Sequence, residues 1–266
     1  MLGRISGLVW CAFASAPLPA QFDARLDLSS STRYVWHGLS RAGGIGLHPS
    51  AAAGFRFGAF TLATGLVRHY ELDRQGQGTG RVGEDNVWAQ GGFDHGRFRF
   101  RSGVVRYVFR DPLRNTTELY AVAGATSRYL NPSLEAWWDV GRVHGGFLRA
   151  TASSPVIGWP LEPYFFLALT GDVGVNLGQA PNPARPNDLA NFAGRGVTHA
   201  GFGVNLVRRL RHWSGLGSAS LELGLNSQLN LDEATRDDGI ARRRNLITWF
   251  SAGITVLLGG EARVLR

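Results

Sequence analysis

A period-two alternation of apolar and polar residues recurs along this chain from Phe22 to Leu258. In residues 219–230, ASLELGLNSQLN, the leucines at 221, 223 and 225 share one parity, while Glu222, Asn226 and Gln228 share the other. Successive side chains of a strand point to opposite faces, so each such segment has one apolar face and one polar face. The chain is therefore constrained to β-structure whose two faces meet different surroundings.

The alternating segments are joined by connections that are long and short in turn. The expected strands are residues 22–34, 49–57, 60–69, 86–94, 97–109, 117–128, 134–142, 146–154, 163–176, 196–207, 219–230 and 245–258. An even strand number returns both chain ends to one side, and outer-membrane barrels keep short turns on the periplasmic side and longer loops outside. The pattern predicts an all-β fold, a closed antiparallel transmembrane β-barrel of about 12 strands with short periplasmic turns and longer extracellular loops.

Two of the connections have features from which their structure can be predicted. The proline-rich stretch 177–195 cannot belong to a central strand, and we expect it to fold over or into the mouth of the barrel. The basic residues between 208 and 212 are expected to form a turn after the tenth strand.

The chain contains no apolar run of the roughly 18 residues that a membrane-spanning helix requires. Its 36 glycines suit tight turns and closely paired strands better than helices. If the chain crosses a bilayer, it therefore crosses as strands, in a single domain over residues 21–266.

Residues 1–20 are typical of a secretory signal peptide that is cleaved near Ala20. Arg4 supplies the positive charge, residues 5–16 form the apolar stretch, and the only cysteine, Cys11, lies inside it. A mature chain without cysteine has no disulfide and no cysteine-based metal site. The expected location is the bacterial outer membrane, although the terminal GGEARVLR lacks the aromatic last residue usual in such barrels.

All 28 cationic Lys and Arg positions are arginine, and the formal net charge is +8. Guanidinium groups pair with carboxylates and with phosphates through parallel hydrogen bonds. The arginines are spread over many segments of a secreted chain, which excludes nucleic acid as the expected partner. Outer-membrane lipid and lipopolysaccharide outside the barrel, and small solutes inside it, are the partners that remain.

If the apolar parity faces lipid, the other parity lines the lumen, and it is densely charged. The expected lumen-lining residues are Asp23, Arg25, Asp27, Arg33, Arg56, Asp94, Arg97, Arg99, Arg101, Glu135, Asp139, Arg149, Asp172 and Glu222. These charges either pair to fill a closed interior, since an unpaired buried charge is costly, or border an aqueous pore whose arginine cluster favours anions. About 12 strands enclose room for a narrow pore or one small ligand, so the strand number leaves both alternatives open.

An enzyme and a soluble barrel are the other classes to weigh. The seven histidines are scattered, and the chain contains neither a GxSxG nucleophile elbow nor an HExxH zinc motif, so we expect no enzyme, no cofactor and no metal. Catalysis would require a spatial triad, with His69 or His199 beside a serine. A soluble barrel would instead place Leu221, Leu223 and Leu225 inside, around a ligand.

Two stretches carry a family resemblance. The segment of residues 30–68 resembles the opening of a family of bacterial outer-membrane β-barrels regarded as porins, in which the first strand ends in Tyr-Val-aromatic-basic-Gly-aliphatic-Ser. The motif positions here are Tyr34, Val35, Trp36, His37, Gly38, Leu39 and Ser40, with histidine where arginine is commoner. Residues 131–153 also resemble the paired central strands of that family. The resemblance implies an outer-membrane barrel with a passive channel role, and brings no catalytic residues.

Overall fold

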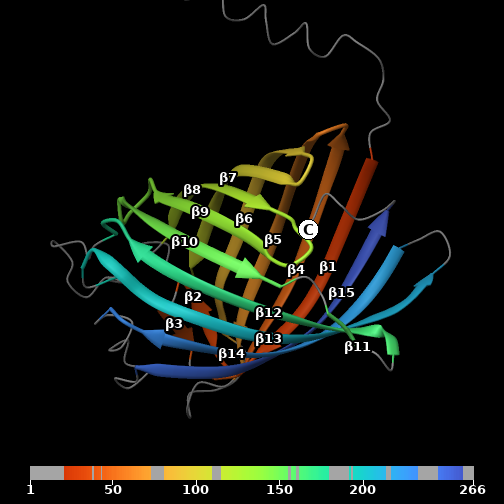
Figure 1. The fold of residues 1–266 in the computed structure, drawn as a ribbon. Helices are drawn as coiled ribbons and strands as arrows, with labels where there is room; N and C mark the ends of the chain where they lie inside the picture. Colours follow the sequence, from red (N-terminus) through yellow and green to blue (C-terminus); the bar gives the residue numbers. More distant parts are fainter. Residues whose placement is uncertain are drawn as a thin grey trace, which may run out of the picture.

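Twelve antiparallel strands close into a barrel in the computed structural model of the chain (Figure 1). The structure describes residues 21–37, 39–42, 44–72, 81–109, 115–154, 157–159, 162–179, 192, 194–213, 217–232 and 245–259. The strands of the ring are β1 (Gln21–Ser31), β4 (Gly46–Phe57), β5 (Phe60–Glu71), β6 (Arg81–His95), β7 (Phe98–Phe109), β8 (Thr116–Ala125), β9 (Asn131–Asp139), β10 (Gly145–Ser153), β12 (Glu162–Asn176), β13 (Gly196–Trp213), β14 (Gly217–Asn230) and β15 (Leu246–Gly259). The prediction of a closed antiparallel barrel is confirmed.

Two strand pairings show that the ring is closed. The first strand, β1, pairs with the last, β15, with Leu26 opposite Val256. The strands β10 and β12 also pair, with Ala150 opposite Val173. A thirteenth strand of the same sheet, β11 (Ile157–Trp159), pairs only with β12, beyond the end of β10, so it extends the wall without adding a position to the ring.

The two ends of the barrel differ in the length of their connections. At one end, here called the loop end, the connections are residues 32–45, 72–80, 110–115, 140–144, 177–195 and 231–245. At the other end, the turn end, they are residues 58–59, 96–97, 126–130, 154–161 and 214–216. The alternation of long and short connections therefore agrees with the sequence prediction, and β1 begins and β15 finishes at the turn end.

The outer face of the ring is apolar. Leu221, Leu223 and Leu225 are exposed by 39%, 59% and 43%, so they point outward and the inverted, soluble alternative is wrong. Near the turn end, six exposed phenylalanines form a belt on neighbouring strands: Phe22, Phe55, Phe57, Phe60, Phe98 and Phe100. An apolar band bordered by aromatic side chains is the surface that barrels present to a bilayer.

No helix in the described part of the chain is long and apolar enough to span a membrane.

Two details differ from the sequence prediction. The first strand ends at Ser31 rather than at residue 34, and Tyr34 and the residues after it form a separate hairpin, β2 (Tyr34–Trp36) and β3 (Leu39–Ala42). The basic residues 208–212 continue β13, whose 18 residues run on to Trp213. The expected signal peptide, residues 1–20, and the tail beyond 259 lie outside the described residues.

Candidate functional site

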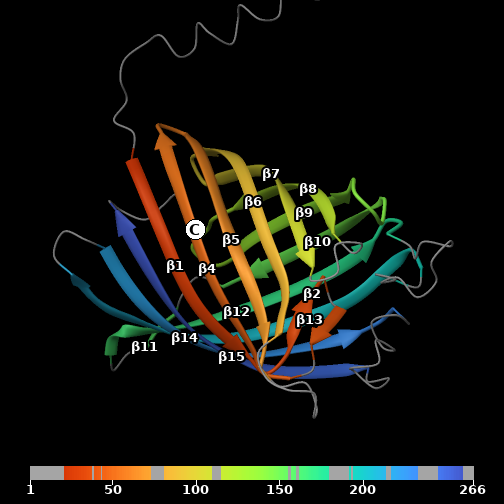
Figure 2. The ribbon, with the colours of Figure 1, turned by 180° about the vertical axis from the view of Figure 1, so that it is seen from behind.

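The β2–β3 hairpin lies inside the barrel near the loop end, where Figures 1 and 2 show it within the ring of strands. The chain leaves β1 at Ser31 and is held at the bend by Thr32, whose backbone N–H donates to the Phe250 carbonyl at 2.9 Å. The Thr32 hydroxyl in turn accepts the Phe250 N–H at 3.0 Å. These two bonds to β15 direct the chain off the wall and into the lumen.

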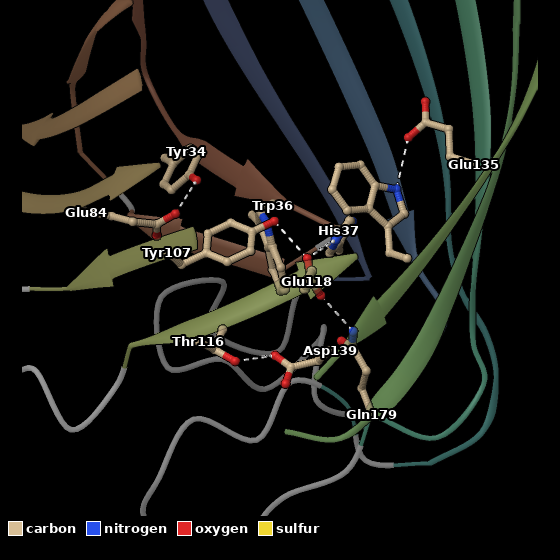
Figure 3. Close-up of polar contacts among 11 residues, drawn as sticks. Tyr34, Trp36, His37, Glu84, Tyr107, Thr116, Glu118, Glu135, Asp139 and Gln179 are labelled. Atoms are coloured by element: carbon tan, nitrogen blue, oxygen red, sulfur yellow. Dashed lines mark hydrogen bonds and ion pairs between the residues drawn. The ribbon is translucent and has the colours of Figure 1, made fainter. Parts of the chain in front are cut away.

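Tyr34 anchors the first strand of the hairpin. Its ring stacks on the imidazole of His69, with centroids 4.2 Å apart and planes inclined by 21°. Its hydroxyl donates to Glu84 Oε1 at 3.3 Å, and Glu84 is buried on β6 (Figure 3). Tyr34 therefore joins the hairpin to two neighbouring strands of the wall, β5 and β6.

A second anchor gathers around the fully buried carboxylate of Glu118 on β8 (Figure 3). The Tyr107 hydroxyl donates to Glu118 Oε2 at 2.8 Å, and Trp36 Nε1 donates to the same tyrosine oxygen at 3.2 Å. From the other side, Gln179 Nε2 donates to Glu118 Oε1 at 2.9 Å. A buried carboxylate is tolerated only with such partners, so Glu118 ties the hairpin and the 177–195 connection to the wall.

His37 occupies the tip of the hairpin, with a φ of 46° in the left-handed region. Its Nε2 lies 3.5 Å from Glu118 Oε2 but makes no hydrogen bond within the described residues. Burial lowers the pKa of the His37 imidazole, because it disfavours the charged form, and the neighbouring Glu118 carboxylate opposes that shift only in part. His37 is therefore held mainly as the neutral imidazole.

An apolar cluster completes the packing at this level of the lumen. Leu39 of the hairpin, Phe147 of β10 and Phe192 of the 177–195 connection are buried together, and Trp36 and Trp137 pack against them. The rings of Phe147 and Phe192 stack with centroids 5.5 Å apart. The buried Phe192 and Gln179 agree with the expectation that this connection enters the barrel mouth, while residues 180–191 lie outside the described part of the chain.

The residues of the family motif therefore have a different role in the fold from the one predicted. Its residues were expected to end the first strand, but Tyr34, Trp36 and His37 are the side chains that seat the hairpin on the wall. Gly38 and the side chain of Ser40 lie outside the described part.

Many of the predicted lumen-lining charges share the inner parity of their strands and pair there. Arg25 Nε lies 2.8 Å from Asp27 Oδ2, and Asp27 also accepts hydroxyl protons from Ser50 on β4 and Thr255 on β15. Arg99 and Glu222 share the same parity on β7 and β14, opposite to the exposed Phe98 and Leu223.

The lumen contains two further ion-pair groups. The Asp94 carboxylate accepts hydrogen bonds from the guanidinium groups of Arg56, at 3.1 Å, and of Arg101. Asp172 lies 3.1 Å from Arg149 Nε and 3.0 Å from His199 Nε2. Each carboxylate is shared by two cationic or imidazole groups, so these charges form small networks rather than an unpaired row.

Five predicted positions have other local surroundings, and two of them, Arg97 and Arg33, lie in a turn or a bend rather than on a strand. Arg97 lies in the exposed turn between β6 and β7, with its guanidinium 5.1 Å from the ring of Phe98. Asp139 is buried and accepts backbone N–H bonds from the 140–144 connection, so it caps that turn. Arg33 lies in the bend after β1, and Asp23 is fully buried. Glu135 accepts the Trp137 indole N–H at 3.2 Å.

Sequence reasoning named His69 and His199 but missed His48 and the aromatic side chains on the inner face. Tyr120 stacks on Trp137 at 4.7 Å, and His48 lies beside His69 with ring centroids 4.8 Å apart. Their inward parity was visible in the alternation, but only the charged members of that parity were selected. Among the described residues no group of three His, Cys, Asp or Glu side chains is arranged to hold a metal ion.

No protein-family model and no curated protein matches this sequence. Among solved structures the chain is similar to the KdgM porin, at 12% identity over 87% of this chain and 98% of that chain, with a TM-score of 0.47. It is also similar to an outer membrane channel from Pseudomonas putida F1, at 11% identity over 91% of this chain and 97% of that chain, with a TM-score of 0.46.

The outer membrane phospholipase A of Escherichia coli is similar at 12% identity over 88% of this chain and 92% of that chain, with a TM-score of 0.44.

Proposed function

We propose that the protein is an outer-membrane β-barrel that acts as a narrow passive channel for small, preferentially anionic solutes. The observation that carries this proposal is the division of the ring into an apolar outer face and a charged inner face, with one short hairpin occupying part of the loop end. Water that fills the rest of the lumen would leave a polar path from one end to the other.

Orientation and partners follow from the two ends. The turn end has the shorter connections and carries the start of β1 and the end of β15, which favours the periplasmic side. The long connections then lie on the extracellular side, where lipid and lipopolysaccharide are the expected neighbours. The YVWHGLS motif supports membership in the porin family described above, again as a proposal.

Anion preference rests on the more exposed guanidinium groups. The side chains of Arg25 and Arg149 remain 36% and 41% exposed although each is ion-paired. By contrast, Arg56 and Arg101 are 17% and 10% exposed, and Arg101 also donates to the carbonyl of Phe100. We therefore assign solute contact to Arg25 and Arg149, and a wall-stiffening role to Arg56 and Arg101.

A structural or surface-interaction barrel with a closed lumen is the second candidate. It is favoured by the apolar cluster of Leu39, Phe147 and Phe192, whose buried side chains fill part of the loop end. The two candidates differ in one respect, whether an ion can pass the hairpin.

Planar-bilayer recording of the purified, refolded full-length protein separates the candidates. The channel proposal expects discrete conductance steps and a reversal potential in a salt gradient that indicates anion preference. Folding of the barrel is verified by heat-modifiable gel mobility. If folded protein gives no conductance steps, the closed alternative is established.

A further inference from the structure

Four inward side chains form a continuous hydrogen-bonded chain across four adjacent strands. Ser31 Oγ on β1 lies 3.0 Å from His48 Nε2 on β4. His48 Nδ1 lies 2.8 Å from His69 Nδ1 on β5. His69 Nε2 then lies 3.2 Å from the amide of Asn86 on β6. We call this set the Ser31 relay.

The bonding roles within the relay are tightly constrained. Two imidazole nitrogens 2.8 Å apart share a single proton, so one Nδ1 donates and the other accepts. If His48 Nδ1 donates, His48 Nε2 is free to accept the Ser31 hydroxyl proton, and His69 Nε2 becomes a donor toward Asn86.

The Asn86 amide completes this arrangement once its side-chain oxygen and nitrogen are exchanged by a 180° rotation of the amide group. Its Nδ2 faces His69, while its Oδ1 is buried and has no hydrogen-bond partner among the described residues. Exchanging the two atoms, which have nearly the same shape, lets Oδ1 accept the His69 Nε2 proton. A serine, a base that accepts its proton and groups that orient the base are then connected in one line.

The backbone makes room for the base. A Cβ at Gly46 would lie 2.7 Å from Cε1 and 2.9 Å from Nε2 of His48, so only glycine lets the imidazole reach Ser31 from this side. The ring of Tyr34 covers the two imidazoles, with centroids 4.2 Å from His69 and 5.5 Å from His48. The imidazoles are thus held in place from two directions, which is the condition for a preorganised base.

We propose that the Ser31 relay is a catalytic site for acyl transfer, in which Ser31 is the nucleophile and His48 the general base. His69 and Asn86 are positioning residues that hold the imidazole of His48 in the accepting tautomer. The substrate class is a carboxylic ester small enough to enter the lumen from the loop end. This activity is separate from conduction and does not depend on it.

The reaction balances within the site and with water from the lumen. Ser31 Oγ attacks the ester carbonyl while its proton passes to His48 Nε2, and the imidazolium can share its Nδ1 proton with His69. Collapse of the adduct breaks the ester C–O bond, and the leaving alcohol takes the proton from His48. A water molecule then attacks the acyl-serine, His48 accepts its proton, and release of the carboxylic acid returns the proton to Ser31.

The test is covalent labelling of the refolded full-length protein with a fluorophosphonate, followed by mass analysis of the modified peptide. We expect labelling of Ser31 that Ser31→Ala abolishes and His48→Gln slows by about 100-fold. Ser133→Ala is the matched control, because Ser133 lies on the inner face of β9 and its hydroxyl bonds to that of Thr151 on β10, away from the four strands of the relay. Labelling of Ser31 in this variant should equal that in the unaltered protein.

Asn86 separates a catalytic relay from a merely structural one. Asn86→Ala should slow labelling, while Asn86→Asp, which keeps an oxygen acceptor, should restore it, and hydrolysis of p-nitrophenyl acetate should follow the same order. If folded protein is labelled at Ser31 no faster than background, or if His48→Gln is labelled as fast as the unaltered protein, the chain of hydrogen bonds only braces the wall. Should His48→Gln not refold, His69→Gln gives the same comparison.

Discussion

At the scale of single residues, one carboxylate holds an entire connection. Asp139 Oδ1 accepts the backbone N–H groups of residues 141, 142, 143 and 144, at 2.9–3.3 Å, and Oδ2 accepts the Thr116 hydroxyl. Asp139→Ala removes the shared acceptor of these partly buried N–H groups and should lower the free energy of unfolding by about 2–3 kcal/mol. Asp139→Asn keeps one acceptor oxygen and should cost less. Denaturant unfolding of both variants measures the difference, and equal losses would contradict the capping role.

His37 gives the hairpin a dependence on pH. Since burial lowers its pKa, the unseated hairpin binds protons more readily than the seated one. The stabilisation from His37 is therefore complete above its ordinary pKa of about 6.5 and is lost as the pH falls toward the lowered value. The protection of the hairpin amides against hydrogen exchange, taken relative to the intrinsic exchange rate at each pH, should be lower at pH 5 than at pH 7.5, and His37→Gln should remove part of this difference. Protection that is the same at both pH values in the unaltered protein would contradict the account.

At the scale of elements, the strands were readable from the sequence and the hairpin was not. Alternation located all twelve strands of the ring because each has an outer face in an apolar phase and an inner face in water or protein. The same alternation continues through Tyr34 and Trp36, so nothing local shows that these residues leave the wall. Their position depends on long-range partners. Tyr107, which accepts the Trp36 indole N–H, lies on β7, 71 residues further along the chain, and Glu118, which accepts the Tyr107 hydroxyl, lies on the next strand, β8.

The site was predictable to a similar extent. The inward parity identified Asp27, Asp94 and Asp172 as lumen groups, and the structure pairs each with an arginine. Parity does not show which side chain finds a local use, so the capping of a turn by Asp139 was not foreseen. The sequence analysis considered His69 beside a serine, but the members of the Ser31 relay could not be identified from the sequence. They come from four strands and are adjacent only through the register of the sheet.

Close strand approach at Gly103 supplies a prediction for the β6–β7–β8 wall. A Cβ at this position would fall on the carbonyl oxygen of Ala89 and 2.8 Å from the ring of Tyr120. Because a backbone atom cannot move aside as a side chain can, Gly103→Ala should reduce the yield or the thermal stability of the refolded barrel. Gly171→Ala is the control, since its Cβ would meet only the Gly201 carbonyl, at 3.7 Å. Similar behaviour of both variants would argue against tight packing at this point.

At the scale of the whole molecule, ion preference should follow the exposure of the arginines rather than their number. Replacing Arg25 and Arg149 together by glutamine should shift the reversal potential toward cations, because these guanidinium groups meet the lumen. Arg97→Gln, in the exposed turn, should leave the reversal potential unchanged. A larger shift from Arg97 than from the Arg25 and Arg149 pair would reverse the assignment.

The central claim is that the protein conducts and that the β2–β3 hairpin narrows its lumen. Single-channel recordings of the unaltered protein and of a variant in which residues 33–43 are replaced by a short glycine-serine linker test it most directly. We predict small conductance steps for the first and larger steps for the second, in protein shown to be folded. Equal conductance would contradict the role of the hairpin, and the absence of steps from both folded proteins would contradict the channel itself.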